Sequence, residues 1–102
     1  LADPPEPAML LDVREPAELG TGVVPQSIPI PLGELTGRLV DLPRSQWTFV
    51  HCQSGYRSSI AGSLLRRAGF ERVVNVTGGF NAWKSAGLPV ATPETNPKVR
   101  AV

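Results

Sequence analysis

The stretch WTFVHCQSGYRSSIAGSLLRRAGF, residues 47–70, decides which fold the sequence predicts. Its first five residues are rich in β-branched and aromatic side chains, which is typical of a buried strand. Between Ser58 and Ala68, apolar side chains then recur on one helical face: Ile60, Ala61, Leu64, Leu65 and Ala68. The polar loop that holds Cys52, the only cysteine of the chain, therefore connects the carboxyl end of a strand to the start of a helix.

Cys52 stands at the place where ligands bind in open α/β sheets. A helix that begins directly after the loop supplies unpaired backbone N–H groups and the positive end of its dipole. These groups, together with the guanidinium of Arg57, favour the thiolate over a thiol whose pKa is ordinarily about 8.5. A structural cysteine would be followed by more core residues, whereas six residues without an aliphatic side chain follow Cys52. We therefore interpret Cys52 as a nucleophile beside an anion-binding loop.

The spacing within the loop separates two kinds of cysteine chemistry. Four residues lie between Cys52 and Arg57. Cysteine-dependent phosphatases have a wider loop, which holds a phosphate with the arginine as a bidentate ligand. The narrower loop suits one additional sulfur atom on the cysteine better than a bound oxyanion. The spacing thus favours sulfur transfer over a phosphatase or an arsenate reductase, with a regulatory or binding module that lacks chemistry as a further alternative.

Composition limits the function classes. The chain has 102 residues, 41% of them hydrophobic, and a formal charge of +1, so it can form one compact domain but lacks the basic surface of a nucleic-acid binder. No apolar run approaches the ~18 residues of a membrane span. One cysteine cannot form an internal disulfide, which fits a reducing compartment, and we expect a cytoplasmic location. Because the chain begins with Leu1, we expect a piece of a longer protein or a processed one.

The order of the expected elements predicts an α/β fold. We expect residues 1–8 to form a lead-in or trimmed element, 9–91 the domain, and 92–102 an extended or mobile tail. Strands are expected over residues 9–13, 27–31, 47–51 and 73–76, and helices over 16–19, 32–42, 58–68 and 80–86. Pro29 and Pro31 place the second strand at a sheet edge or make it very short.

Four separated segments resemble the signatures of rhodanese domains, which are sulfurtransferases. They are LLDVREPAEL (10–19), IPIPLGEL (28–35), VHCQSGYRSSIAGSLLRRAGF (50–70) and VVNVTGGFNAWKSAGLPV (73–90). The resemblance implies a doubly wound, mostly parallel sheet of about five strands with helices on both faces. Rhodanese domains usually have one more short strand and helix before the DVRE segment, and only eight residues precede Met9 here. The strand count is therefore expected to be five, give or take one.

The resemblance also implies roles for individual residues. Cys52 would take a sulfane sulfur from thiosulfate or a thiol persulfide and pass it to cyanide, sulfite or a thiol. The expected substrate-binding residues, whose backbone N–H groups line the loop, are Gln53, Ser54, Gly55, Tyr56 and Ser58. Supporting residues are Asp12, Arg14, Glu15 and Gly79. Arg57 is expected to be catalytic, either facing the substrate or, as we favour, anchored by Asp12 or Glu15.

His51 alternates with Cys52 along the strand, so we expect it to pack on the opposite face.

Sulfur transfer of this kind implies no metal and no organic cofactor, because a persulfide on Cys52 is the covalent intermediate. The expected partners are a small-molecule sulfur donor and a thiol acceptor, with no nucleic acid and no membrane. The loop is similar to those of rhodanese domains fused to metallo-β-lactamase-like persulfide dioxygenases or to disulfide reductases. A fused or partner enzyme domain is therefore part of the expectation, and the oligomeric state is left open.

Overall fold

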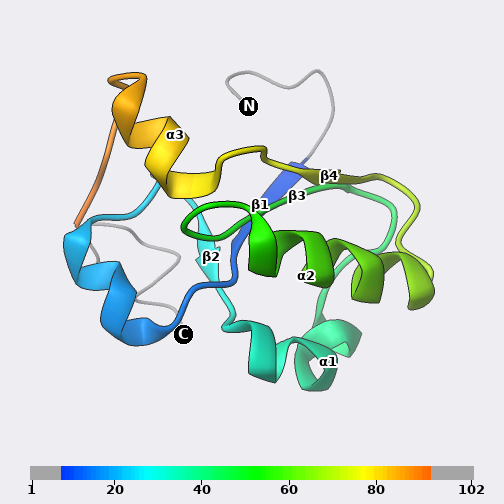
Figure 1. Ribbon diagram of the computed structural model, residues 1–102. Coiled ribbons are helices and arrows are strands. Elements are labelled where there is room, and N and C mark those ends of the chain that lie inside the picture. Colours follow the sequence, from blue (N-terminus) through cyan, green and yellow to red (C-terminus); the bar gives the residue numbers. More distant parts are fainter. Residues whose placement is uncertain (1–7, 93–102) are drawn as a thin grey trace.

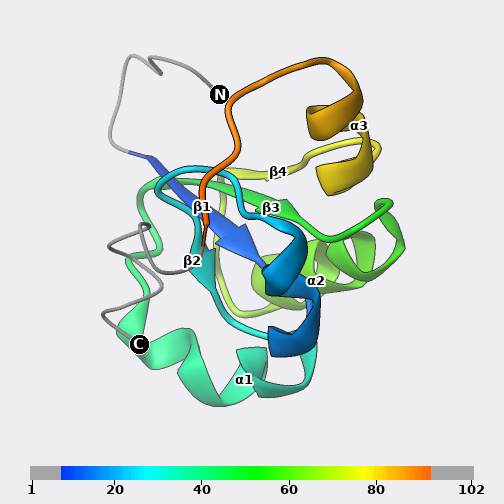
Figure 2. The same cartoon turned by 90° about the vertical axis from the view of Figure 1, so that its left-hand side faces the viewer.

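The computed structural model describes residues 8–92, and its strands form one parallel sheet (Figures 1 and 2). The strands are β1 (Ala8–Asp12), β2 (Ile28–Pro29), β3 (Trp47–His51) and β4 (Val73–Asn75). They are hydrogen-bonded in the order β2-β1-β3-β4. The described part of the chain therefore holds four strands where about five were expected. The predicted lead-in was 1–8, and Ala8 instead begins β1, while residues 1–7 lie outside the described residues. Of the predicted tail, 92–102, all but Thr92 lies outside them.

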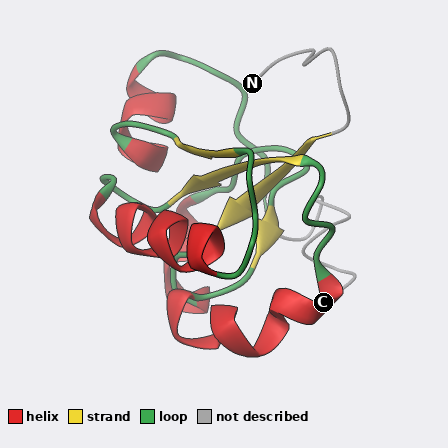
Figure 3. Ribbon diagram, turned by 90° about the vertical axis from the view of Figure 1, so that its right-hand side faces the viewer, coloured by secondary structure: helices red, strands yellow, loops and turns green. Residues whose placement is uncertain are grey.

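Helical segments alternate with the strands and cover both faces of the sheet, as expected (Figures 1 and 3). The longest are α2 (Tyr56–Arg67) and α3 (Gly79–Ser85), which lie on opposite sides of the sheet. A 3-10 turn, η1 (Pro16–Thr21), follows β1, with proline in its first turn as the sequence predicts. Among the described residues, no helix has both the length and the apolar character needed to cross a bilayer.

The segment 32–42 differs from the single helix that leucine spacing predicts. It consists of three short pieces, η2 (Leu32–Glu34), α1 (Leu35–Arg38) and η3 (Leu39–Asp41). Two glycines, Gly33 and Gly37, lower the helix propensity here. Packing against the core therefore determines the local backbone, and no single regular helix forms. The leucine spacing still identifies the buried side: Leu35 is fully buried, and Leu32, Leu39 and Leu42 pack against the core.

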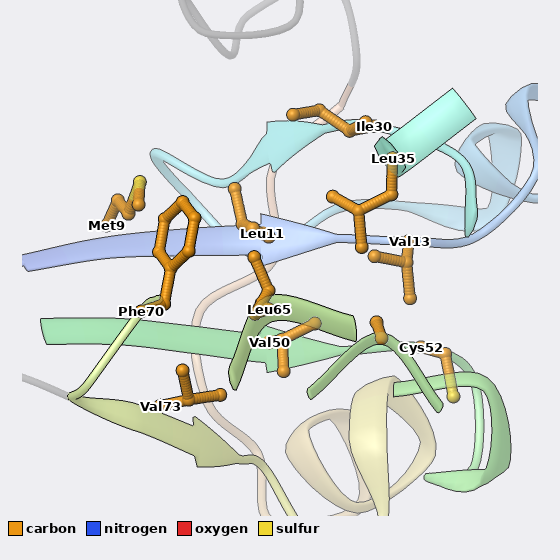
Figure 4. Close-up of a cluster of buried hydrophobic side chains, with 11 residues drawn as sticks. Met9, Leu11, Val13, Ile30, Leu35, Val50, Cys52, Leu65, Phe70 and Val73 are labelled. Carbon is orange, nitrogen blue, oxygen red and sulfur yellow. The ribbon is translucent and has the colours of Figure 1, made fainter. Parts of the chain in front are cut away.

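One face of the sheet forms the hydrophobic core under α2 (Figure 4). Alternate residues of β1 and β3 point to this face, and Leu11 is the register partner of Val50. Residues of α2 complete the cluster on this face, among them Ala61 and Leu65, which are fully buried. Cys52 lies at the margin of this cluster, directly after β3 ends. The core thus fixes the strand end that carries the candidate nucleophile.

Edge strand β2 is as short as its prolines predict. It pairs with β1 alone, through Leu11 with Ile28 and Asp12 with Pro29. The missing N–H of a proline costs nothing on the side of a strand that has no neighbour. The prediction of an edge position for this strand is therefore confirmed.

Candidate active site

The thiol of Cys52 is enclosed by hydrogen-bond donors of the loop and of the first turn of α2. The backbone N–H of Gly55 donates to Sγ at 3.1 Å, and that of Ser58 at 3.4 Å. The hydroxyl oxygen of Ser58 lies 3.6 Å from Sγ. Burial raises the pKa of this fully buried thiol, but the hydrogen bonds from Ser58, Gly55 and Ser54 outweigh burial and lower it below its ordinary value.

The loop reaches this geometry because Gly55 takes a left-handed conformation, with φ +113°, immediately before α2. A glycine adopts that conformation without the steric cost that a side chain would add. The turn brings Sγ to the start of the helix, where the first N–H groups have no partner within the helix. Sγ therefore accepts from Ser58 as a capping side chain would.

The start of α3 holds the other side of the loop. The N–H of Phe80 donates to the carbonyl of Cys52 at 2.8 Å, and the N–H of Asn81 donates to the carbonyl of Gln53 at 2.9 Å. In a trans peptide the C=O and the following N–H point in opposite directions. Binding these two carbonyls on the α3 side therefore turns the N–H groups of Gln53 and Ser54 away from α3. This contribution of α3 was not predicted from the sequence.

Gly79 makes the close approach of α3 to the loop possible. Its φ is +57°, and a Cβ at this position would lie 2.5 Å from the carbonyl oxygen of Cys52 and 3.0 Å from the carbonyl carbon of Gln53. No side chain fits at such distances. Gly79 was predicted as a supporting residue, and the structure places its backbone directly against the loop.

The anchor of Arg57 is Glu18, and not Asp12 or Glu15 as predicted. Its Nη1 donates to Oε1 of Glu18 at 2.6 Å and its Nη2 to Oε2 at 2.7 Å, which is a bidentate pair. This pairing is the main reason that the pKa of Glu18 falls from 4.5 to about 2. Glu15 is exposed, and its backbone N–H donates to Oε1 of Glu18 at 2.8 Å. The first turn after β1 thus presents Glu18 to the loop.

Asp12 is instead the partner of Arg14, and this pair is fully buried. Nη2 of Arg14 lies 2.8 Å from Oδ2 of Asp12 and also donates to the carbonyl of Gly22 at 2.9 Å. The guanidinium carbon lies 4.3 Å from the ring centroid of Phe80. A buried ion pair is stable only when its remaining hydrogen-bonding capacity is met in this way.

Arg14 also reaches the loop, through Gln53. Its Nη1 donates to Oε1 of Gln53 at 3.1 Å, while Nε2 of Gln53 donates to Oδ1 of Asn81 at 2.6 Å. Both ends of the Gln53 side chain are therefore occupied by the protein. Of the residues expected to bind substrate, Ser54 and Tyr56 are the exposed ones, and 77% of the Tyr56 surface is accessible.

His51 is buried on the side of β3 away from the core, as its alternation with Cys52 predicts. Its Nδ1 lies 3.2 Å from the carbonyl oxygen of Cys52, and its Nε2 lies 3.7 Å from Oδ2 of Asp12. Nε2 has no hydrogen-bond partner among the described residues. Burial lowers the pKa of His51 by more than the nearby Asp12 raises it. The imidazole is therefore neutral in the folded protein near neutral pH.

This burial predicts that acid destabilises the fold before the carboxylates titrate. An unfolded histidine takes up a proton near pH ~6.5, whereas folded His51 does so only at lower pH, so stability falls as the pH drops below about 6.5. Melting temperatures measured between pH ~7 and ~5 give the slope of stability against pH. His51→Gln should flatten it, since His51 is the only histidine of the chain. Equal slopes in both proteins would show that His51 does not titrate in this way.

Comparison with known proteins identifies the family. The model of the rhodanese-like domain matches residues 1–86. The chain belongs to the rhodanese-like domain family. It is 37% identical over 89 residues to a sulfurtransferase of Allochromatium vinosum, and this alignment covers 87% of the chain and 83% of the relative. It is also 34% identical over 84 residues to the putative sulfurtransferase YtwF of Bacillus subtilis, covering 82% and 81% of the two proteins.

The solved structures agree with this assignment. The crystal structure of a rhodanese-related protein from Thermoplasma volcanium superimposes on this rhodanese-like domain with a TM-score of 0.78 and 39% identity, covering 82% and 83% of the two chains. The chain also matches longer curated relatives, of which it covers 50% and 44%. The family and its α/β fold are thus established from both sequence and structure.

Proposed function

We propose that this rhodanese-like domain is a sulfurtransferase that carries sulfane sulfur on Cys52. The observation that supports the proposal most strongly is the ring of donors around Sγ, with the N–H groups of Gly55 and Ser58 at 3.1 and 3.4 Å. Such donors stabilise a sulfur anion wherever it forms in the reaction. Because a thiolate is the reactive form of cysteine, they also raise the fraction of Cys52 that can attack.

The reaction proceeds through two displacements at sulfur. The Cys52 thiolate attacks the outer sulfur of the donor, a bond forms between Sγ and that sulfur, and the donor S–S bond breaks. The leaving group is sulfite when thiosulfate is the donor, and a thiolate when a persulfide is the donor. An acceptor thiolate, sulfite or cyanide then attacks the outer sulfur of the Cys52 persulfide, and Sγ leaves as a thiolate. The cycle returns Cys52 to its starting state and needs no external oxidant or reductant.

The proposal includes the reaction partners and the setting. We propose that no metal or organic cofactor takes part, since the transferred sulfur stays covalently bound to Cys52. The donor and the acceptor are small molecules, nucleic acid and membrane take no part, and a fused or partner enzyme domain supplies or consumes the sulfur. A reactive thiol of this kind survives in a reducing compartment, which supports a cytoplasmic location.

The charge distribution at the loop favours an organic persulfide over thiosulfate as the donor. Arg57 is the cation of the loop, and its guanidinium is bound to both carboxylate oxygens of Glu18. A dianion such as thiosulfate therefore gains little attraction from this neutralised pair. Tyr56 instead presents an exposed amphipathic ring, 77% accessible, beside the loop. Such a ring suits the organic part of a thiol carrier such as glutathione.

Steady-state kinetics with the two donors tests this preference. We expect kcat/KM to be higher for glutathione persulfide than for thiosulfate in the wild type. Glu18→Gln removes the negative partner of Arg57, so the kcat/KM for thiosulfate relative to that for glutathione persulfide should rise several-fold. If thiosulfate is the better wild-type donor and Glu18→Gln leaves the ratio unchanged, then Arg57 serves the substrate despite its pairing, and the charge argument is wrong.

A further inference from the structure

The hydroxyl of Ser58 has three acceptors within reach and only one proton. Its oxygen lies 2.6 Å from Oδ1 of Asn75, 3.1 Å from the carbonyl oxygen of Gly55 and 3.6 Å from Sγ of Cys52. Ser58 is fully buried, so the proton must be directed to one of these groups. The very short contact with Asn75 shows which group receives it in this structure.

The direction of that proton depends on the charge of Cys52. A thiol donates its own proton to the Ser58 oxygen, and the hydroxyl can then donate onward to Oδ1 of Asn75. A thiolate has no proton to donate and needs one from Ser58. When the hydroxyl turns to Sγ, the Ser58 oxygen presents a lone pair towards Asn75. The partner at position 75 must then supply a donor where it previously supplied an acceptor.

Asparagine meets both requirements because its amide carries an acceptor and two donors on one planar group. A half-turn about the last side-chain bond exchanges the oxygen with the nitrogen. Asn75 is the last residue of β4 and the register partner of Val50, so it lies on the sheet face that α2 covers. Aspartate at this position could only accept, and leucine, which has nearly the same shape, could do neither.

We propose that Asn75 is a positioning residue whose amide turns over as Cys52 loses its proton, so that Ser58 donates to Asn75 in the thiol state and to Sγ in the thiolate state. In the thiolate state the nitrogen of Asn75 donates to the Ser58 oxygen, and no hydrogen bond of the chain Cys52, Ser58, Asn75 is lost. Asn75 does not touch the reacting sulfur. It acts through Ser58, and the loop keeps its geometry in both states.

The other titratable groups named around Cys52 are either paired with one another, neutral or exposed. On α2, Arg57 is bound to Glu18 of η1, and each stabilises the charged form of the other. On the far side of β3, the Asp12–Arg14 pair is fully buried and His51 is neutral. Lys84 of α3 and Tyr56 of α2 are exposed. The Ser58–Asn75 pair is therefore the part of the site whose hydrogen bonds must be rearranged when Cys52 ionises.

The test measures the ionisation of Cys52 directly, through the pH dependence of its alkylation by iodoacetamide. Because Cys52 is the only cysteine, the reaction reports on this thiol alone. We expect the midpoint pH to rise in the order Asn75, Asn75→Leu, Asn75→Asp, by about half a unit for leucine and by more than about one unit for aspartate. Leucine removes the donor that the thiolate state needs, whereas in the thiol state the Ser58 proton can still go to the carbonyl of Gly55. Aspartate also holds the Ser58 proton away from Sγ.

The same substitutions in a Ser58→Ala background provide the control. Without the hydroxyl, Asn75→Leu should leave the midpoint unchanged, and Asn75→Asp should retain only the smaller effect of a nearby charge. If each substitution shifts the midpoint equally in both backgrounds, Asn75 does not act through Ser58 and the proposal is wrong. Circular dichroism establishes that each variant is folded. If Asn75→Asp does not fold, Asn75→Leu compared with and without Ser58→Ala decides whether Asn75 acts through Ser58.

The alkylation experiment needs no sulfur donor. The inference rests on the proposed function only for its consequence, which is that Asn75→Leu slows turnover at neutral pH by about the factor that its midpoint shift predicts. If the protein does not transfer sulfur, the alkylation midpoints of the variants still test the role of Asn75. Equal midpoints for the Asn75 and Asn75→Leu proteins would overturn the positioning role without affecting sulfur transfer.

Discussion

Cys52→Ser should abolish thiocyanate formation from thiosulfate and cyanide while leaving the protein folded. The serine hydroxyl does not ionise near neutral pH, and it cannot form the S–S bond that carries the sulfur. We expect a loss of at least about a thousandfold, which is the scale seen when a nucleophile is removed from an enzyme. The hydroxyl oxygen is smaller than the sulfur that it replaces, but at this fully buried position it can accept from the same N–H groups of Gly55 and Ser58, so the melting temperature should change by only a few degrees.

A second variant separates the chemistry of Cys52 from its packing. Cys52→Ala should be equally inactive, and it should lose some stability because the side chain lies at the margin of the core. Turnover at the wild-type rate in either protein would remove Cys52 from the mechanism. Folded but inactive proteins in both cases would assign the loss to the sulfur atom.

Among substitutions outside the loop, Gly79→Ala should cause the largest loss of activity. The backbone at Gly79 has φ +57°, where a side chain costs about 1–3 kcal/mol. The new Cβ would also lie 2.5 Å from the carbonyl oxygen of Cys52. Because the clash is with the backbone of the loop that holds Cys52, the 2.8 Å hydrogen bond between Phe80 and Cys52 cannot persist. We expect a lower melting temperature, a higher alkylation midpoint for Cys52 and a loss on the order of 10-fold or more in kcat/KM.

Gly37→Ala is the matched control for this substitution. Gly37 lies within α1, its φ is not in the positive range, and a Cβ there would meet no heavy atom within 4 Å. Alanine favours the helix over glycine by up to about 1 kcal/mol, so this variant should be as stable as the wild type or more stable. Full activity in Gly79→Ala would contradict the role that we assign to the start of α3.

The sequence predicted the parts of the site that local patterns determine. The strand, loop and helix around Cys52 follow from a run of β-branched and aromatic residues, a polar segment and helical spacing. The edge position of β2 follows from Pro29, and the burial of His51 follows from strand alternation. Each of these features depends on residues that are neighbours along the chain, which explains why they could be recognised without a structure.

The features that the sequence did not predict depend on contacts between distant segments. Glu18 meets Arg57 across 39 positions. The pattern of the 10–19 segment instead directed attention to the carboxylates of Asp12 and Glu15, which lie closer along the chain to the end of β1. Asn75 meets Ser58 across 17 positions. Gly79 was predicted as a supporting residue, but only the folded chain shows that the start of α3 binds the carbonyls of the loop. The fifth expected strand has no counterpart within residues 8–92.

The most direct test of sulfur transfer is the intact mass of the protein after incubation with glutathione persulfide and removal of the excess donor. We predict a gain of one sulfur atom in the wild type, which cyanide then removes, and no gain in Cys52→Ser. A phosphatase or a binding module without chemistry would show no such gain. An unchanged mass for the wild type, or an equal gain in Cys52→Ser, would contradict the proposal that Cys52 carries the sulfur.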